Sequence, residues 1–253
     1  MSEAGIAGRV AFVTGASSGL GARFARVLAA AGARIAMAAR REDRLVALAE
    51  ELRADGAEAI TLPLDVGSVP SIHEAMAATE ARLGPVSILV NNAGISRQAR
   101  LEDVTEEDYD RLMDTNLKGA FFTAQAAARQ MIAHGLEGRI VNIASIAGLR
   151  ALGQLGTYSM SKAAMVQMTR SMAREWGRHG INTNAICPGY IATEISADFL
   201  DTAGGQKLLA TLPRRRMGEP RDLDGLLLLM CSGEPARFIN GAIITADDGF
   251  TAY

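Results

Sequence analysis

The amino-acid sequence alternates between short, mostly apolar runs and longer stretches in which apolar residues recur every three to four positions. The short runs predict β-strands over residues 9–15, 34–39, 58–64, 86–92, 139–145, 181–187 and 241–247. Several of them are apolar almost throughout, which is typical of strands covered on both faces of a parallel sheet. The longer stretches predict helices over residues 19–31, 42–54, 68–82, 105–134, 157–177 and 220–231.

Strands and helices in this alternation predict an α/β fold in which a doubly wound, seven-stranded parallel sheet carries helices on both faces. The chain shows no repeat, low-complexity tract or linker, so we expect residues 1–253 to form a single domain. The stretch 188–219 breaks the pattern with several prolines and glycines. A long irregular segment in a compact domain is typical of a lid or binding loop, and we expect a substrate loop at about residues 190–215.

A glycine-rich turn follows the first predicted strand. Residues 14–21 read TGASSGLG, and a helical pattern begins within them. Glycines at 15, 19 and 21 let the backbone approach a pyrophosphate, which the N–H groups at the start of a helix can bind. The spacing differs from the general G-x-G-x-x-G fingerprint, and a glycine-rich turn also occurs where packing is merely tight. Its place directly after the first strand nevertheless predicts a dinucleotide site.

Polar or turn residues follow the other predicted strands, at the edge where open α/β sheets bind ligands. They are Asp65 with Val66, Asn91 to Gly94, Ser145, Pro188 with Gly189, and Thr193. Each alone has an ordinary reading as a turn or cap residue. Asp65, for example, either accepts from an adenine amino group or caps the next helix. Their shared position at one edge of the sheet predicts a common binding site.

One tyrosine and one lysine stand four positions apart in the stretch TYSMSKAAM, residues 157–165. The chain has three lysines and four tyrosines, so such a pair arises by chance about one time in twenty. On a helix, Tyr158 and Lys162 would share one face. The pair by itself suggests a functional site, and the simpler alternative is a half-buried tyrosine beside a surface lysine, so the surrounding motifs have to decide.

Taken together, the motifs resemble the short-chain dehydrogenase/reductase family, in its single-domain branch of about this length. The resemblance covers about residues 8–249. It rests on TGASSGLG, DV at 65–66, NNAG at 91–94, Asn116 in TNLKGAF, Ser145 in NIASIAG, YSMSK at 158–162 and PGYIAT at 188–193. It implies a Rossmann-type fold, a nicotinamide cofactor, and a catalytic set that falls on Asn116, Ser145, Tyr158 and Lys162.

The chemistry of carbonyl reduction explains this set. Reduction of a ketone creates an alkoxide that must be protonated, and Tyr158 is the expected general acid–base. The ammonium of Lys162 is expected to lower the tyrosine pKa, and Ser145 to polarise the carbonyl by donating a hydrogen bond. The resemblance implies that Lys162 also holds the nicotinamide ribose. It further implies that Asn116 lies in a kinked helix and completes a proton relay through a bound water.

The cofactor is expected to be NADP(H), with NAD(H) possible. Enzymes that prefer NAD usually carry an acidic residue after the second strand, and here Arg40 and Arg41 follow instead. We expect Arg40 to be the main contact to a 2′-phosphate and Arg41 the second, with Ser17 as a further donor. The resemblance implies that Thr193 contacts the nicotinamide carboxamide. The predicted cofactor-binding residues are Gly15, Ser17, Ser18, Gly19, Leu20, Gly21, Arg40, Arg41, Asp65, Val66, Asn92, Ala93, Gly94, Tyr158, Lys162, Pro188, Gly189, Ile191 and Thr193.

The sequence does not identify the substrate. By position, Ser96, Gln154, Leu155 and Tyr190 are expected to contact a small molecule, and neighbouring leucines suggest an apolar pocket. One alternative is a reductase of 3-oxoacyl groups on acyl carrier protein, for which Arg129 and Arg174 could serve as docking residues. The acidic stretch 102–110 would repel that acidic partner. An alternative of another class is a non-catalytic redox sensor that binds the same cofactor.

The composition indicates which classes of partner and which cellular compartment to expect. The formal net charge of −2 gives no basic footprint for nucleic acid, and the arginine run 214–216 reads as a solvated loop. Cys187 and Cys231 have no metal-ligand spacing and are expected to be buried thiols, and no metal is expected. A secretory signal and a membrane span are also not apparent, which predicts a cytoplasmic protein that binds no membrane. The apolar surfaces of helices 105–134 and 157–177 predict a homotetramer.

Overall fold

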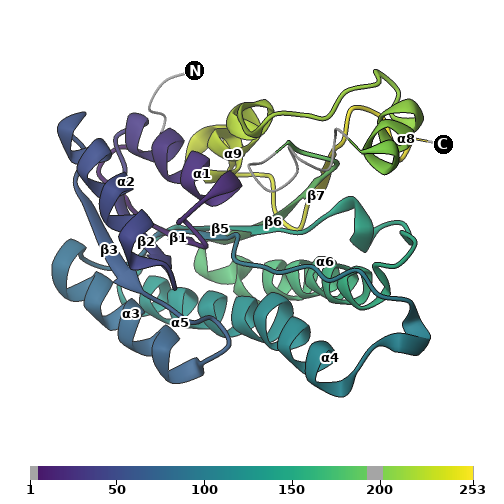
Figure 1. Cartoon of the computed structure of the whole chain (residues 1–253). Coiled ribbons are helices and arrows are strands. Elements are labelled where there is room, and N and C mark those ends of the chain that lie inside the picture. Colours follow the sequence, from purple (N-terminus) through teal and green to yellow (C-terminus); the bar gives the residue numbers. More distant parts are fainter. Residues whose placement is uncertain (1–4, 193–201, 253) are drawn as a thin grey trace.

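The computed structural model describes residues 5–192 and 202–252, and it contains a parallel sheet of seven strands with helices on both faces (Figure 1). The strand order is β3-β2-β1-β4-β5-β6-β7, with every neighbouring pair parallel. The predicted fold class is therefore confirmed. The strands are β1 Val10–Thr14, β2 Arg34–Ala39, β3 Ala59–Pro63, β4 Ile88–Asn91, β5 Gly138–Ile143, β6 Ile181–Pro188 and β7 Ile243–Ala246.

Helices cover the sheet in two groups. Those described are α1 Gly19–Ala30, α2 Glu42–Ala54, α3 Val69–Leu83, α4 Glu106–Met113, α5 Gly119–Ala133, α6 Gly156–Trp176, α8 Ala203–Thr211 and α9 Asp224–Cys231. Side chains alternate across a strand, so Ala11 and Val13 pack with α1, α2 and α9. Val10 and Phe12 point the other way, into a core with α3, α5 and α6. Within the described residues, no helix is long and apolar enough to cross a bilayer.

The seven predicted strands are all present, but two of the predicted helices and the predicted irregular stretch need correction. The predicted helix 105–134 is divided, because a π-helical turn at Asp114–Lys118 separates α4 from α5. The predicted helix 220–231 begins as a 3₁₀ turn at Pro220–Leu223, where a proline occupies the first turn. The segment 188–219 is not irregular throughout, because it contains α8, whose N-cap Thr202 accepts a hydrogen bond from Gly205 N.

The sheet order places the carboxyl ends of β1 and β4 side by side at the point where the strand order reverses. An open α/β sheet binds its ligands in the crevice at such a point, because the connections leave the two strands in opposite directions. Residues that follow β1, β2, β3 and β4 therefore meet on one side of the reversal. Residues that follow β5, β6 and β7 meet on the other side.

Candidate active site

The glycine turn after β1 opens onto a cavity of about 470 Å³. The cavity is lined by residues of the predicted cofactor set, among them Ser17 and Ser18 of the turn, Arg40 and Arg41 after β2, and Asp65 after β3. The remaining lining residues of this set are Gly15, Leu20, Val66, Asn92, Ala93 and Gly94. Gly189 and Ile191 of the same set do not line this cavity and instead face a separate one of about 290 Å³. Thr193 lies outside the described residues.

The glycines are required by close backbone contacts. Gly15 has a φ of +66°, and a Cβ there would lie 2.9 Å from Ala93 Cα. A Cβ at Gly21 would overlap the carbonyl oxygen of Gly15. Among the described residues, the Ser18 side chain makes no capping hydrogen bond to α1, so the first N–H groups of this helix remain available for an anion. The cavity and the helix start therefore fit a dinucleotide with its phosphates at the turn.

The two arginines after β2 are placed differently. The guanidinium of Arg41 reaches the glycine turn, where Nη2 donates to Ser17 Oγ at 3.0 Å and to Ser18 Oγ at 2.6 Å. Arg40 lines the same cavity, and both arginines are exposed. Asp65 is not the cap of the following helix, because that role belongs to Ser68, while Asp65 Oδ1 accepts from Gly67 N at 3.0 Å. The arrangement concentrates positive charge beside the two serines.

Asn92 closes the turn from the opposite side. Its Nδ2 donates to the carbonyl oxygens of Thr14 and Gly15, at 3.0 Å and 3.3 Å. The Thr14 hydroxyl in turn accepts from the N–H groups of Asn92 and Ala93, both at 3.0 Å. Asn92 thus supports the glycine turn from within the protein in addition to lining the cavity.

Asn116 occupies the middle of the π-helical turn between α4 and α5 and is fully buried. Its Oδ1 accepts from Ile95 N at 2.8 Å, and its Nδ2 donates to Ile95 O at 2.9 Å and to Ser161 Oγ at 3.2 Å. A π turn inserts an extra residue and is frequent at functional sites. The polar amide that is awkward in a regular helix is here satisfied by the loop after β4.

Lys162 crosses the core beneath the tyrosine. Its Nζ donates to Ile143 O at 2.7 Å and lies 5.7 Å from the centroid of the Tyr158 ring. Burial lowers the pKa of Lys162 to about 8, because desolvation penalises the ammonium. The lysine is thus a buried member of the site and not a surface residue.

Tyr158 and Ser145 are joined by a hydrogen bond between their side chains. Ser145 also caps the 3₁₀ turn Ile146–Gly148, since its Oγ accepts from Ala147 N at 3.1 Å. Burial raises the pKa of Tyr158, and the bond to Ser145 only opposes this rise. The expected lowering of the tyrosine pKa is therefore not what this structure gives: desolvation outweighs the favourable contacts of the phenolate.

Sequence reasoning missed two participants. Ser161 is fully buried, donates to the Tyr158 carbonyl oxygen at 2.7 Å and accepts from Asn116. Its position three residues after Tyr158, on the same helix face, was the available signal. Ile95 contributes only backbone atoms, which no pattern of residue types reveals. Cys187, a predicted buried thiol, lies near Lys162 and Ser145, and burial raises its pKa.

The predicted substrate residues come from three loops. Gln154 has a φ of +61°, and its carbonyl oxygen accepts from Ala99 N at 3.0 Å, so the loop after β5 is joined to the loop after β4. Leu155 lies in the same backbone bridge with Ala99. Ser96 is exposed in the loop after β4, and Tyr190 is half-buried after β6. Within the described residues, no cluster of acidic, histidine or cysteine side chains could hold a metal ion.

Comparison with known proteins identifies the family. A family model described as short chain dehydrogenase matches residues 9–203. The chain belongs to the short-chain dehydrogenase/reductase family. Gluconate 5-dehydrogenase of Gluconobacter oxydans is 37% identical over 97% of this chain and 96% of its own length.

Two further relatives of this family show its range. Acetoacetyl-CoA reductase of Shinella zoogloeoides is 37% identical over 95% of this chain and 98% of its own. The crystal structure of a gluconate 5-dehydrogenase from Burkholderia cenocepacia in complex with NADP and tartrate is 36% identical, with a TM-score of 0.93 over 100% of this chain and 98% of that one. As a short-chain dehydrogenase/reductase, the protein is an oxidoreductase.

Replacing Lys162 with methionine is expected to raise the free energy of unfolding at pH 7 by about 2 kcal/mol, since the gain from removing the buried ammonium exceeds the loss of one hydrogen bond. Below pH 8 the folded wild type carries this charge. Between about 8 and the ordinary value of 10.5, it releases the proton before the unfolded chain does, so wild-type stability rises and the difference shrinks. Urea unfolding at neutral and alkaline pH measures this. Lys118→Met, at an exposed lysine paired with Asp114, is the control. A Lys162→Met protein that is less stable at both pH values would contradict the expectation.

Proposed function

We propose that the protein is an NADP(H)-dependent oxidoreductase that interconverts a ketone and a secondary alcohol, with Tyr158 as general acid–base. The observation that carries this proposal is the half-buried Tyr158, hydrogen-bonded to Ser145 and lying above the buried Lys162 on one helix face. A bound nicotinamide would supply or accept the hydride. The residues of this chain then have to bind the carbonyl oxygen and move one proton to or from it.

Each of the four residues has a separable part in this proposal. Ser145 Oγ–H donates to the substrate oxygen, which favours the charge that develops there during reduction. Tyr158 passes its phenolic proton to the same oxygen. Lys162 lies below the ring, where its ammonium stabilises the phenolate left behind. Asn116 fixes the π turn and the loop at Ile95, so it acts by positioning the chain around the site.

Tyr158→Phe is expected to lower kcat about a thousandfold, because only the proton donor is removed. NADPH binding, followed by its fluorescence, should stay within twofold of wild type. Tyr109→Phe, at a partly exposed tyrosine of α4, should retain full activity. A Tyr158→Phe enzyme that keeps more than about a tenth of the wild-type kcat would rule out this role.

NADP(H) is the proposed cofactor because the end of β2 presents arginines and no carboxylate to the cavity. Relatives of known structure include the Burkholderia enzyme solved with NADP. Arg41 is favoured over Arg40 as the main contact to a 2′-phosphate, which reverses the order expected from the sequence. Both arginines are exposed, but the guanidinium of Arg41 is already held by hydrogen bonds to Ser17 and Ser18. A fixed guanidinium loses less side-chain entropy when it binds a phosphate.

Arg41→Ala is therefore expected to lower kcat/KM for NADPH by about tenfold or more, and Arg40→Ala by less. The efficiency with NADH should change by no more than about twofold in either variant, because NADH has no 2′-phosphate to lose. Steady-state rates with the two reduced cofactors decide the matter. A wild-type preference for NADH, or an Arg41→Ala enzyme with unchanged NADPH efficiency, would refute the assignment.

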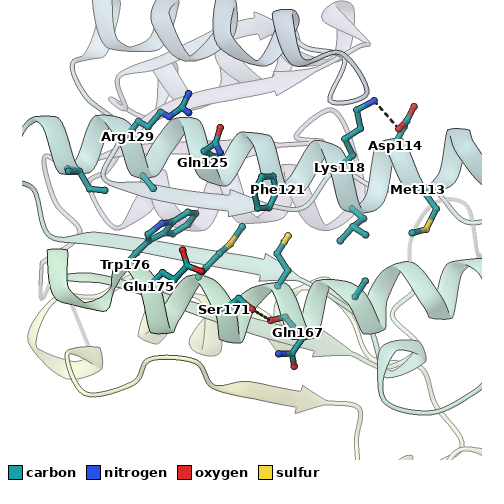
Figure 2. Close-up of a pocket in the computed structure, with 16 residues that line it drawn as sticks. Met113, Asp114, Lys118, Phe121, Gln125, Arg129, Gln167, Ser171, Glu175 and Trp176 are labelled. Carbon is teal, nitrogen blue, oxygen red and sulfur yellow. Dashed lines mark hydrogen bonds and ion pairs between the residues drawn. The ribbon is translucent and has the colours of Figure 1, made fainter.

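We propose a homotetramer in which α4, α5 and α6 pair with those of a second copy. A groove of about 850 Å³ runs between α5 and α6, and Figure 2 shows Phe121 and Trp176 lying between these two helices. Phe121 is 38% exposed and Ile132 41% exposed, and Met168 also lines the groove. Apolar side chains gathered along two long helices favour a helical partner over solvent.

Phe121→Arg is expected to reduce the sedimentation coefficient from that of a tetramer to that of a smaller species, because it places a charge in the centre of the groove. Val46→Arg provides the control, since Val46 is an equally exposed apolar residue on α2, away from the groove. Sedimentation velocity at micromolar concentration measures both. A wild type that sediments as a monomer would contradict the proposal.

A further inference from the structure

The C-terminal segment 247–251 forms a tight turn directly after β7. Asp247 organises this turn, since its carboxylate accepts from Gly249 N, Thr251 N and Thr251 Oγ at 3.1, 2.8 and 2.6 Å. Asp248, with a φ of +57°, points out of the turn and pairs with Arg214 at 3.2 Å and Arg216 at 3.9 Å. Two residues of the arginine run 214–216 thus hold the end of the chain, which Figure 1 shows beside α8. The run is exposed, as expected of a solvated loop, and two of its guanidinium groups also pair with Asp248.

Phe250, at the tip of this turn, lies in an aromatic and cationic contact. Its ring packs edge-on against Tyr190, with centroids 5.5 Å apart and planes at 82°. The guanidinium of Arg150 lies 5.3 Å from the Phe250 ring centroid, and its Nη1 donates to Phe250 O at 3.4 Å. Tyr190 is half-buried, and its partial burial raises its pKa. The Phe250 side chain is therefore held on two sides.

The three members of this cluster follow three neighbouring strands. Arg150 lies in the loop after β5, five residues beyond Ser145, and Tyr190 follows β6, three residues beyond Cys187, which is close to Tyr158. Phe250 follows β7. Because the carboxyl ends of these parallel strands share one edge, the cluster lies at the same edge of the sheet as Ser145, which follows β5. It lies on the opposite side of the strand-order reversal from the cofactor cavity.

We infer that Phe250, fixed between Arg150 and Tyr190, is the wall that limits the size of the substrate, and that the substrate is a ketone or secondary alcohol with a compact apolar substituent. This inference rests on the proposed function and deepens it. Two aromatic rings present an apolar surface, and Leu149, 45% exposed in the loop with Arg150, extends it. Polyhydroxylated chains would lose hydrogen bonds to water against such a wall. Arg150 acts through Phe250 and is a positioning residue.

The test compares kcat/KM for acetone, acetophenone and benzophenone with NADPH, and includes ketogluconate as a polyhydroxylated substrate. Wild type is expected to prefer acetophenone over both benzophenone and ketogluconate. Phe250→Ala should raise the ratio of benzophenone to acetophenone efficiency about tenfold, mainly through KM, because a shorter side chain admits the second ring. Phe250→Leu, which keeps an apolar wall, should retain most of the wild-type ratio.

Arg150→Ala should shift the same ratio in the same direction by a smaller factor. The double variant Arg150→Ala/Phe250→Ala should match Phe250→Ala alone, since a residue that acts through Phe250 has no effect once that ring is gone. Phe238→Ala is the matched control, because Phe238 is 99% exposed and precedes β7 in the same C-terminal region. It should leave the ratio unchanged.

An unchanged ratio in Phe250→Ala, an additive double variant, or a wild-type preference for ketogluconate overturns the inference while leaving the proposed oxidoreductase intact. A wild type that reduces none of the four ketones overturns the proposed function, and the inference falls with it. A ratio of benzophenone to acetophenone efficiency that rises in Phe250→Ala and not in Phe238→Ala supports both the inference and the proposed function. Thermal unfolding of each variant identifies any that fail to fold. If Phe250→Ala does not fold, Phe250→Leu is compared with Phe250→Trp, and the larger tryptophan side chain should lower the ratio of benzophenone to acetophenone efficiency.

Discussion

The Thr14 hydroxyl joins the carboxyl ends of β1 and β4 at the point where the strand order reverses, and both halves of the site depend on this contact. It accepts from Asn92 N and Ala93 N at 3.0 Å, while the Asn92 amide returns a hydrogen bond to Thr14 O. The glycine turn is thereby fixed against the loop that leads to Ile95. Ile95 in turn holds Asn116 through two backbone hydrogen bonds. One threonine therefore connects the cofactor cavity with the π turn, and a shift at either end would disturb both.

Much of the fold could be predicted because several strands are apolar on both faces and each strand appears in the sequence as a short run bounded by turn residues. The π turn at Asp114–Lys118 could not be read from periodicity, since the helical pattern continues through it and only the awkward position of Asn116 marks it. The α8 helix was missed because its first turn contains Gly204 and Gly205, which weaken any helical pattern. The spacing of Tyr158 and Lys162 predicted a shared face correctly, but it carried no information about depth. The pKa values of Tyr158 and Lys162 are shifted mainly by burial.

Desolvation acts on the two groups in opposite directions and keeps both closer to neutral than in water: burial raises the tyrosine pKa and lowers that of the lysine. A neutral phenol is the form that donates a proton to an alkoxide, so burial suits carbonyl reduction near neutral pH. Alcohol oxidation needs the phenolate, and for that direction the ammonium of Lys162 has to offset the burial of the ring. At neutral pH the tyrosine therefore keeps the proton that the proposed reduction would pass to the substrate oxygen.

The residues that would bind the cofactor and those that would bind the substrate follow different strands of the sheet. The substrate residues can therefore change while the cofactor residues stay the same. The cavity that fits a dinucleotide is lined by residues after β1, β2, β3 and β4, and the glycine turn among them is fixed by backbone contacts that tolerate no Cβ at Gly15 or Gly21. The cluster formed by residues after β5, β6 and β7 is built mainly from side-chain contacts: a guanidinium over a ring, two edge-on rings and two ion pairs to Asp248, with one hydrogen bond from Arg150 to the Phe250 carbonyl oxygen. Side-chain contacts of this kind can be exchanged one at a time, because the strands that carry them are already paired. Ser145 and Tyr158 stand between the two groups, so the same proton transfer can be combined with a different wall.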